Sequence, residues 1–180
     1  MSNCKPTQRK RKMKGKVIII LGSSRSDGET KKLTDTILGI SDFDKIDLND
    51  YSISYYDYEY KNANDDYLNL MQTLINKYDT FVFATPVYWY SMSGIMKVFL
   101  DRFTDLLDNQ KELGRQLRNK KMTVITSSNG GNLGEEFWFP FKETAKYLGM
   151  EYIGNLHTIS NSLNLEQIED FVYKIKTTNG

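Results

Sequence analysis

The sequence contains very little cysteine, because Cys4 is the one cysteine among its 180 residues. A single cysteine cannot form an internal disulfide bond, and it cannot supply the set of thiolates that holds an iron–sulfur cluster. This scarcity therefore excludes iron–sulfur chemistry and favours a reducing, cytoplasmic location.

Long apolar runs are absent as well. A membrane-spanning helix needs about 20 consecutive apolar residues, and no segment approaches that length. A secretory signal needs about 7 to 15 apolar residues after its basic start. Residues 17–21 form a shorter run that continues directly into the polar sequence GSSR. We therefore expect neither a membrane span nor a secretory signal.

Basic residues are scarce beyond the first segment of the chain. Residues 1–16 hold seven basic residues and no acidic one, which leaves 17 basic against 23 acidic residues in the remainder. A face that binds nucleic acid needs clustered Lys and Arg, so we expect no nucleic-acid partner. We interpret residues 1–15 as a disordered basic leader, with a tail for anionic partners as the alternative, and residues 16–180 as a single domain.

The apolar pattern predicts an α/β domain with five strands. Strands are expected at residues 17–21, 45–48, 81–84, 122–125 and 152–156. Helices are expected at residues 30–40, 68–78, 91–107, 135–148 and 165–175. The first strand is continuously apolar and belongs at the centre of the sheet, whereas the less apolar fifth belongs at an edge. This alternation indicates a doubly wound parallel sheet with helices on both faces.

Residues 51–67 do not fit this pattern, because they hold six of the twelve tyrosines mixed with acidic residues. We interpret them as a long irregular loop, a kind of segment that is usually functional or mobile. Such a loop could wall a substrate pocket, contact a partner chain or cap the end of the sheet, and the sequence leaves these alternatives open.

Three Gly- and Ser-rich segments follow three of the expected strands. They are the first loop, GSSRSDGET at 22–30; the second loop, TPVYWYSMSG at 85–94; and the third loop, TSSNGGN at 126–132. In an open α/β sheet, ligands bind beyond the carboxyl ends of the strands, where several such loops meet. The three loops therefore predict a nucleotide-type site.

The first loop has the composition of a phosphate site. It places hydroxyl groups and the guanidinium of Arg25 beside the start of a helix, where free N–H groups favour an anion. The loop lacks GxxxxGK[ST] and GxGxxG, so a monophosphate fits better than a triphosphate or pyrophosphate. Glu29 would repel a phosphate unless it points outward. An ordinary polar turn is the alternative interpretation.

The other two loops fit a planar ring. A proline followed by the aromatics of YWY can form a rigid ring platform, although aromatics at such a position often belong to the core. In the third loop, Gly130 and Gly131 permit close approach of a ligand to the backbone, since glycine has no side chain.

Two motifs carry a family resemblance: the first is GSSRSDGET followed by KKL, and the second is TPVYWYSMSGIMKVFLDR. In them the chain resembles the NAD(P)H-dependent FMN reductase-like oxidoreductases of the flavodoxin superfamily, over residues 16–173. The resemblance implies a flavodoxin-like fold, bound FMN, NAD(P)H as co-substrate, and a homodimer or dimer of dimers. It also implies roles by motif position. The phosphate would be held by Ser23, Arg25 and Thr30; the isoalloxazine by Pro86, Val87, Tyr88 and Trp89; and its far edge by Ser128, Asn129, Gly130 and Gly131.

The predicted function is that of an FMN-dependent NAD(P)H oxidoreductase with a quinone, nitro, azo or flavin acceptor. No catalytic side chain and no metal are expected, because the flavin carries the chemistry. We therefore expect a structural or solvent-exposed role for His157, the single histidine. A flavodoxin-like electron carrier without nicotinamide turnover is the main alternative, and a flavin-binding regulatory protein is a third.

Overall fold

The computed structural model describes residues 15–178, so nearly all of the predicted basic leader lies outside the described residues. Its centre is a parallel sheet of five strands in the order β2-β1-β3-β4-β5. The strands are β1 (Val17–Leu21), β2 (Asp44–Asp47), β3 (Thr80–Pro86), β4 (Lys121–Ser128) and β5 (Glu151–Ile159). This is the flavodoxin-like strand order, and it confirms the predicted fold class.

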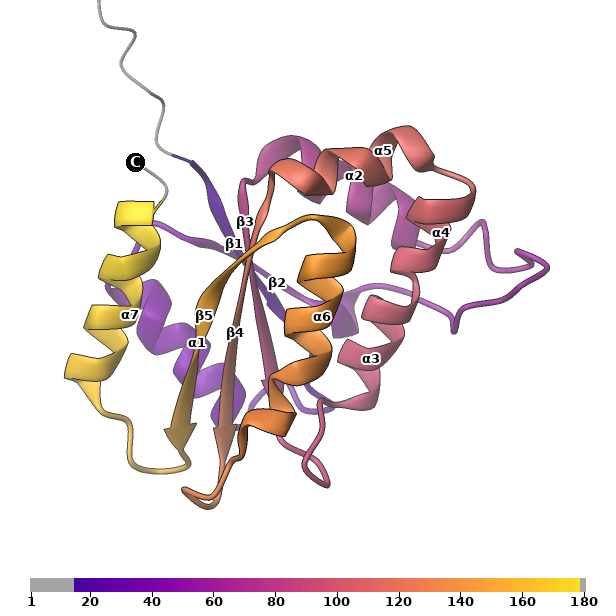
Figure 1. Cartoon of the computed structure of the whole chain (residues 1–180). Helices are drawn as coiled ribbons and strands as arrows, with labels where there is room; N and C mark the ends of the chain where they lie inside the picture. Colours follow the sequence, from indigo (N-terminus) through magenta and orange to yellow (C-terminus); the bar gives the residue numbers. More distant parts are fainter. Residues whose placement is uncertain (1–14, 179–180) are drawn as a thin grey trace, which may run out of the picture.

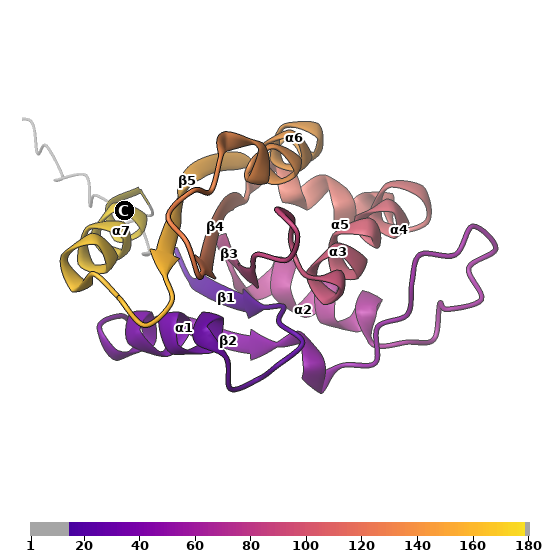
Figure 2. The same ribbon diagram turned by 90° about the horizontal axis from the view of Figure 1, so that it is seen from below.

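Helices cover both faces of the sheet (Figures 1 and 2). One face packs against α1 (Glu29–Gly39) and α7 (Leu165–Thr178). The other packs against α2 (Tyr67–Lys77), α3 (Gly94–Asp101), α4 (Phe103–Asp108) and α6 (Phe139–Leu148). Along β1, successive side chains enter the two cores in turn, which is why its sequence VIIIL is apolar throughout.

Short helices fill the connections. They are the 3₁₀ helices η1 (Leu48–Asp50), η2 (Gln116–Asn119) and η3 (Glu135–Phe137), and the α-helix α5 (Lys111–Arg115). No helix within residues 15–178 is both long and apolar enough to cross a membrane.

Several boundaries differ from the prediction. The middle strand is β3, and β1 lies between β2 and β3, so the expected central place of the first strand was wrong by one position. The predicted helix at 91–107 is two helices that meet at Arg102, and the helix predicted from residue 135 begins at Phe139 after η3. Strand β4 extends through Ser128, so three of the seven residues of the predicted third loop continue the sheet.

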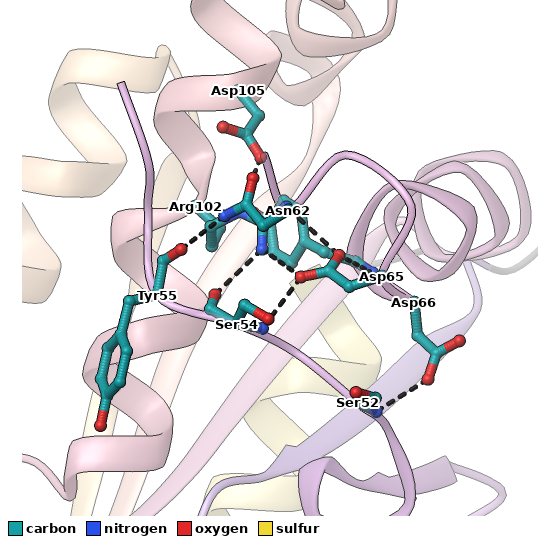
Figure 3. Close-up of polar contacts among 9 residues, drawn as sticks. Ser52, Ser54, Tyr55, Asn62, Asp65, Asp66, Arg102 and Asp105 are labelled. Carbon is teal, nitrogen blue, oxygen red and sulfur yellow. Dashed lines mark hydrogen bonds and ion pairs between the residues drawn. The ribbon is translucent and has the colours of Figure 1, made fainter. Parts of the chain in front are cut away.

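The tyrosine-rich segment between η1 and α2 is a long irregular excursion, as predicted, and it projects from the body of the domain in Figures 1 and 2. It is nevertheless tied to the body at its base. The guanidinium of Arg102 forms ion pairs with Asp65 at 2.5 Å and Asp105 at 2.6 Å, and it donates a hydrogen bond to the carbonyl of Ser54 (Figure 3).

Candidate cofactor site

The three predicted loops follow β1, β3 and β4, which are neighbours in the sheet, and they leave it at the same edge. Figure 2 views the molecule from that edge. Hydrogen bonds join the loops where they begin. Gly22 N donates to Ala84 O at 2.8 Å, and Thr126 Oγ1 donates to Thr85 O at 2.6 Å. The fold therefore brings together segments that lie up to about a hundred residues apart in sequence.

Ser93 joins the first and second loops, a role that the sequence analysis missed. Its hydroxyl donates to Gly22 O at 2.6 Å and accepts from Met96 N at 3.1 Å, which caps the start of α3. A serine before an apolar helix is a recognisable capping signal. Gly22 packs closely against α3, because an added Cβ would lie 3.1 Å from Met96 Cβ and 3.2 Å from Met96 Cα.

Ser23 is buried and bonded within its own loop. Its hydroxyl accepts from Arg25 N at 3.4 Å, and its carbonyl accepts from the amide of Asn49 at 2.7 Å. The same Asn49 amide reaches Ser26 Oγ at 3.3 Å. Asn49, which follows β2, therefore supports the first loop from the neighbouring strand.

The start of α1 retains the features of an anion site. Gly28 occupies the N-cap position and, being glycine, has no side chain to cap the free N–H groups of the first turn. The Arg25 guanidinium lies beside Gly28, since an added Cβ there would be 3.6 Å from Arg25 Nη2. Thr30 is buried in the first turn. These groups fit a phosphate monoester.

The carboxylate of Glu29 has partners outside the first loop. Its carboxylate accepts hydrogen bonds from Lys32 Nζ at 2.5 Å and from Asn161 N at 3.2 Å. The hydrogen bond from Lys32, followed by that from Asn161, lowers the pKa of Glu29. The negative charge is therefore paired, and it is held toward the loop between β5 and α7.

The second loop contains a tight hairpin turn. Tyr88 N donates to Ser91 O at 2.9 Å, and Ser91 N donates to Tyr88 O at 3.0 Å. Both central residues have positive φ, 49° at Trp89 and 61° at Tyr90, as in a type I′ turn. Trp89 is 95% exposed, which excludes the alternative that it belongs to the core. The Tyr88 hydroxyl lies 2.9 Å from Ser24 Oγ and thus links this turn to the first loop.

The third loop is held by the end of β5. Ser128 Oγ donates to Gly130 O at 2.9 Å and lies 2.7 Å from His157 Nε2, while Ser160 N donates to Ser128 O at 2.8 Å. Burial lowers the pKa of His157. An added Cβ at Gly130 would meet no atom within 4 Å, so the backbone is open to a ligand there. Asn129 is exposed beside it.

Together these features offer a suitable partner for each part of FMN. An uncapped helix start with a guanidinium suits the phosphate, an exposed aromatic turn offers a ring platform, and open glycine backbone can approach a ring edge. All eleven predicted site residues lie on the three loops. Ser23 and Thr30 are buried, whereas Arg25 and Trp89 are exposed.

Comparison with known proteins supports the same interpretation. The family model of NADPH-dependent FMN reductase matches residues 15–162, a range that includes all three loops. A curated relative from Bacillus subtilis (strain 168), named "Putative NAD(P)H-dependent FMN-containing oxidoreductase YwqN", is 27% identical over 149 residues, or 77% of this chain and 82% of its own.

Solved structures share the fold. The Trp repressor binding protein from Bacillus subtilis has a TM-score of 0.66 and 23% identity, covering 89% of this chain and 96% of its own. Oxidised flavodoxin 1 from Bacillus cereus has a TM-score of 0.58 and 15% identity, covering 89% and 96%. Because the fold occurs in a flavodoxin too, it cannot by itself separate an enzyme from an electron carrier.

Proposed function

The chain belongs to the NADPH-dependent FMN reductase family, and from this premise we propose that it passes two electrons from NAD(P)H to a small quinone, nitro, azo or flavin acceptor. Membership makes it an FMN-binding, NAD(P)H-dependent oxidoreductase. We propose the class of the acceptor and the residues that hold the cofactor.

FMN held at this site would supply two-electron redox chemistry, through which the reducing equivalents of NAD(P)H would pass to the acceptor. The protein's part is to bind and orient both molecules. We assign the phosphate to Arg25, Thr30 and the free N–H groups that begin α1, with Ser23 shaping the loop from within. Bringing the reactants together in a fixed orientation accelerates the reaction without a protein base.

The ring assignment follows the other two loops. Pro86 and Val87 lead from β3 into the aromatic turn, where Tyr88 and Trp89 offer the platform. Ser128, Asn129, Gly130 and Gly131 would meet the opposite edge of the ring with open backbone. The observation that supports this function most strongly is the meeting of all three loops at one edge of the sheet, within the matched family range.

The test uses the purified protein. Mass spectrometry of the released cofactor should identify FMN, and anaerobic addition of NADPH or NADH should bleach the visible flavin absorbance rapidly. Subsequent addition of a quinone should restore the colour. A protein that binds FMN yet ignores both nicotinamide nucleotides would instead be an electron carrier, and one that binds no flavin would contradict the proposal.

A further inference from the structure

A cavity of about 480 Å³ lies beside the proposed cofactor site. One wall comes from η1 and the tyrosine-rich segment, and the other comes from α3. Its apolar and aromatic lining includes Leu48, Tyr51, Ile53, Tyr55, Ile95 and Val98. Small-molecule sites are usually clefts of about 300 to 1,000 Å³ with a mostly apolar lining. This cavity has a volume in that range and more apolar than polar lining, although it is open to solvent at Tyr55, which is 79% exposed.

The tyrosine wall is a built structure. Ser52 N donates to Asp66 Oδ2 at 2.7 Å, and Ser54 N donates to Asp65 Oδ2 at 2.9 Å. The amide of Asn62 donates to Tyr55 O at 2.5 Å (Figure 3). The anchored serines alternate with the residues at 51, 53 and 55 that line the cavity, as in an extended chain whose alternate side chains share a face.

Arg102 holds this wall in place from the interior of the protein. Its side chain is fully buried, pairs with Asp65 and Asp105, lies 4.7 Å from the centre of the Tyr67 ring, and donates to Ser54 O at 3.0 Å. Burying charges is costly, and apolar side chains can often fill such a space equally well. What the charged cluster provides here is a set of directional bonds to the backbone of the wall.

The cavity also adjoins two of the three cofactor loops. Asn49 lines it and donates to Ser23 O and Ser26 Oγ of the first loop. Gly94, the last residue of the second loop, lines it from the first turn of α3. A molecule in the cavity would therefore contact the same elements that we assign to FMN.

We propose that this cavity binds the ring of the electron acceptor and selects an uncharged, planar aromatic compound. The inference rests on the proposed function and narrows its acceptor class. Two tyrosine rings favour a flat aromatic ligand. None of the residues that line the cavity is charged, so an anionic or cationic ring would lose hydration without gaining a partner there.

Gly94 allows a direct test. An added Cβ there meets no atom within 4 Å and its φ is not left-handed, so Gly94→Leu should fill the cavity without straining the helix. Gly39, at the end of α1, has the same open surroundings, and Gly39→Leu is the matched control. Because Gly94 is itself the last residue of the second loop, Val98→Trp provides a second block from the next turn of α3, outside the three loops.

The probe is menadione, an uncharged bicyclic quinone, added to oxidised holoprotein without NAD(P)H. Methyl NMR signals of Ile53, Ile95 and Val98 should shift and saturate in the wild type. Gly94→Leu and Val98→Trp should weaken menadione binding by about tenfold or more. Val98→Trp, which lies outside the three loops, should also retain the wild-type FMN affinity, and Gly39→Leu should match the wild type throughout.

Absence of these methyl shifts, or unchanged menadione affinity in both blocked variants, would overturn the inference. It would also be overturned if light scattering showed a dimer that either blocking substitution dissociates, since the cavity would then hold a second copy. Failure of the proposed function would be seen in a separate measurement. The purified protein would then lack FMN, or its flavin absorbance would not bleach with NAD(P)H, and both results are obtained without menadione.

Discussion

At the scale of single residues, the turn at Trp89 and Tyr90 is the least expected feature of the molecule. Positive φ costs a residue with a side chain roughly 1 to 2 kcal/mol, and type I′ turns normally use Asn-Gly. Here two exposed aromatic residues occupy both strained positions. Neither local preference nor core packing accounts for them, and strain of this kind is concentrated at functional sites.

Trp89→Gly should separate function from stability. The change relieves about 1 to 2 kcal/mol of backbone strain and costs about 0.5 to 1 kcal/mol in chain entropy, so the apoprotein should melt at the same or a slightly higher temperature. Loss of a ring contact worth about 0.5 to 1.5 kcal/mol should weaken FMN binding modestly and reduce turnover more. Tyr90→Gly is the control, with similar relief and near-normal turnover. A marked loss of melting temperature would contradict this view of Trp89.

Arg25→Ala should weaken FMN binding by about 10- to 150-fold, since a hydrogen bond to a charged group contributes about 1.5 to 3 kcal/mol. Riboflavin, which lacks the phosphate, should bind the variant and the wild type equally. Lys97→Ala removes a positive charge from an exposed pair on α3 and should change neither affinity. Equal losses for both flavins would remove Arg25 from the phosphate site.

His157 should act as a positioning residue for the third loop. The Ser128 hydroxyl donates its one hydrogen to Gly130 O, so it must accept from His157 Nε2–H. His157→Leu should weaken FMN binding by roughly three- to tenfold, while His157→Gln, which can still donate, should restore most of it.

Because the chain has one histidine, nitrogen NMR of the apoprotein can read this tautomer without overlap. The ordinary pKa is about 6.5 and burial lowers it, so the ring is neutral near pH 8. A neutral ring protonated at Nδ1 would refute the assigned direction of the hydrogen bond.

At the scale of elements, apolar spacing predicted every strand and the main helices to within a few residues, because each element contributes to the cores. The break between α3 and α4 could not be read from that pattern. Phe99, Phe103 and Leu106 continue one apolar stripe across it. What distinguishes the junction is the pairing of Arg102 with Asp65, a partner 37 residues away. Asn49 was missed for the same reason, since its contact with Ser23 spans 26 residues.

The Arg102 cluster should make unfolding sensitive to acid. Burial raises the pKa of Asp65, but hydrogen bonds from Arg102 and from the backbone of Ser54 and Tyr67 outweigh burial, so the pKa lies below its ordinary value. A carboxyl with a depressed pKa in the folded state stabilises above its unfolded pKa of about 3.9, and this contribution is lost as pH falls through the folded pKa.

Urea unfolding across a series of acidic pH values should therefore show a smaller loss of stability in Asp65→Asn than in the wild type. The same variant should be less stable at neutral pH, because Arg102 remains buried with one carboxylate fewer. Asp101→Asn, which removes an exposed partner of Lys97, should follow the wild-type profile. Parallel profiles for all three proteins would show that the cluster does not control acid unfolding.

At the scale of the whole molecule, sheet order creates the site. The first loop follows β1 and the second follows β3, with β2 placed outside them, so the chain reverses direction across the sheet at this point. Flavodoxin-like sheets bind ligands at this kind of switch point. The sequence could predict that the loops meet, because the carboxyl ends of parallel strands lie at a common edge of the sheet. The sequence could not predict the exposure of the aromatic turn, which depends on α3 and the core being complete without it.

That exposed turn leads to the last prediction, that the holoprotein is a homodimer or dimer of dimers in which a partner chain covers Trp89. Light scattering should give about twice the 20.9 kDa chain mass or a multiple of that. Trp138 is 4% exposed and Trp89 is 95% exposed, so Trp138→Phe leaves one reporter at the proposed interface. Its emission should shift to the blue as dilute protein is concentrated through the dimerisation range, because the indole loses water. A fully active monomer, or a dimer that forms without any shift of Trp89 emission, would refute the prediction.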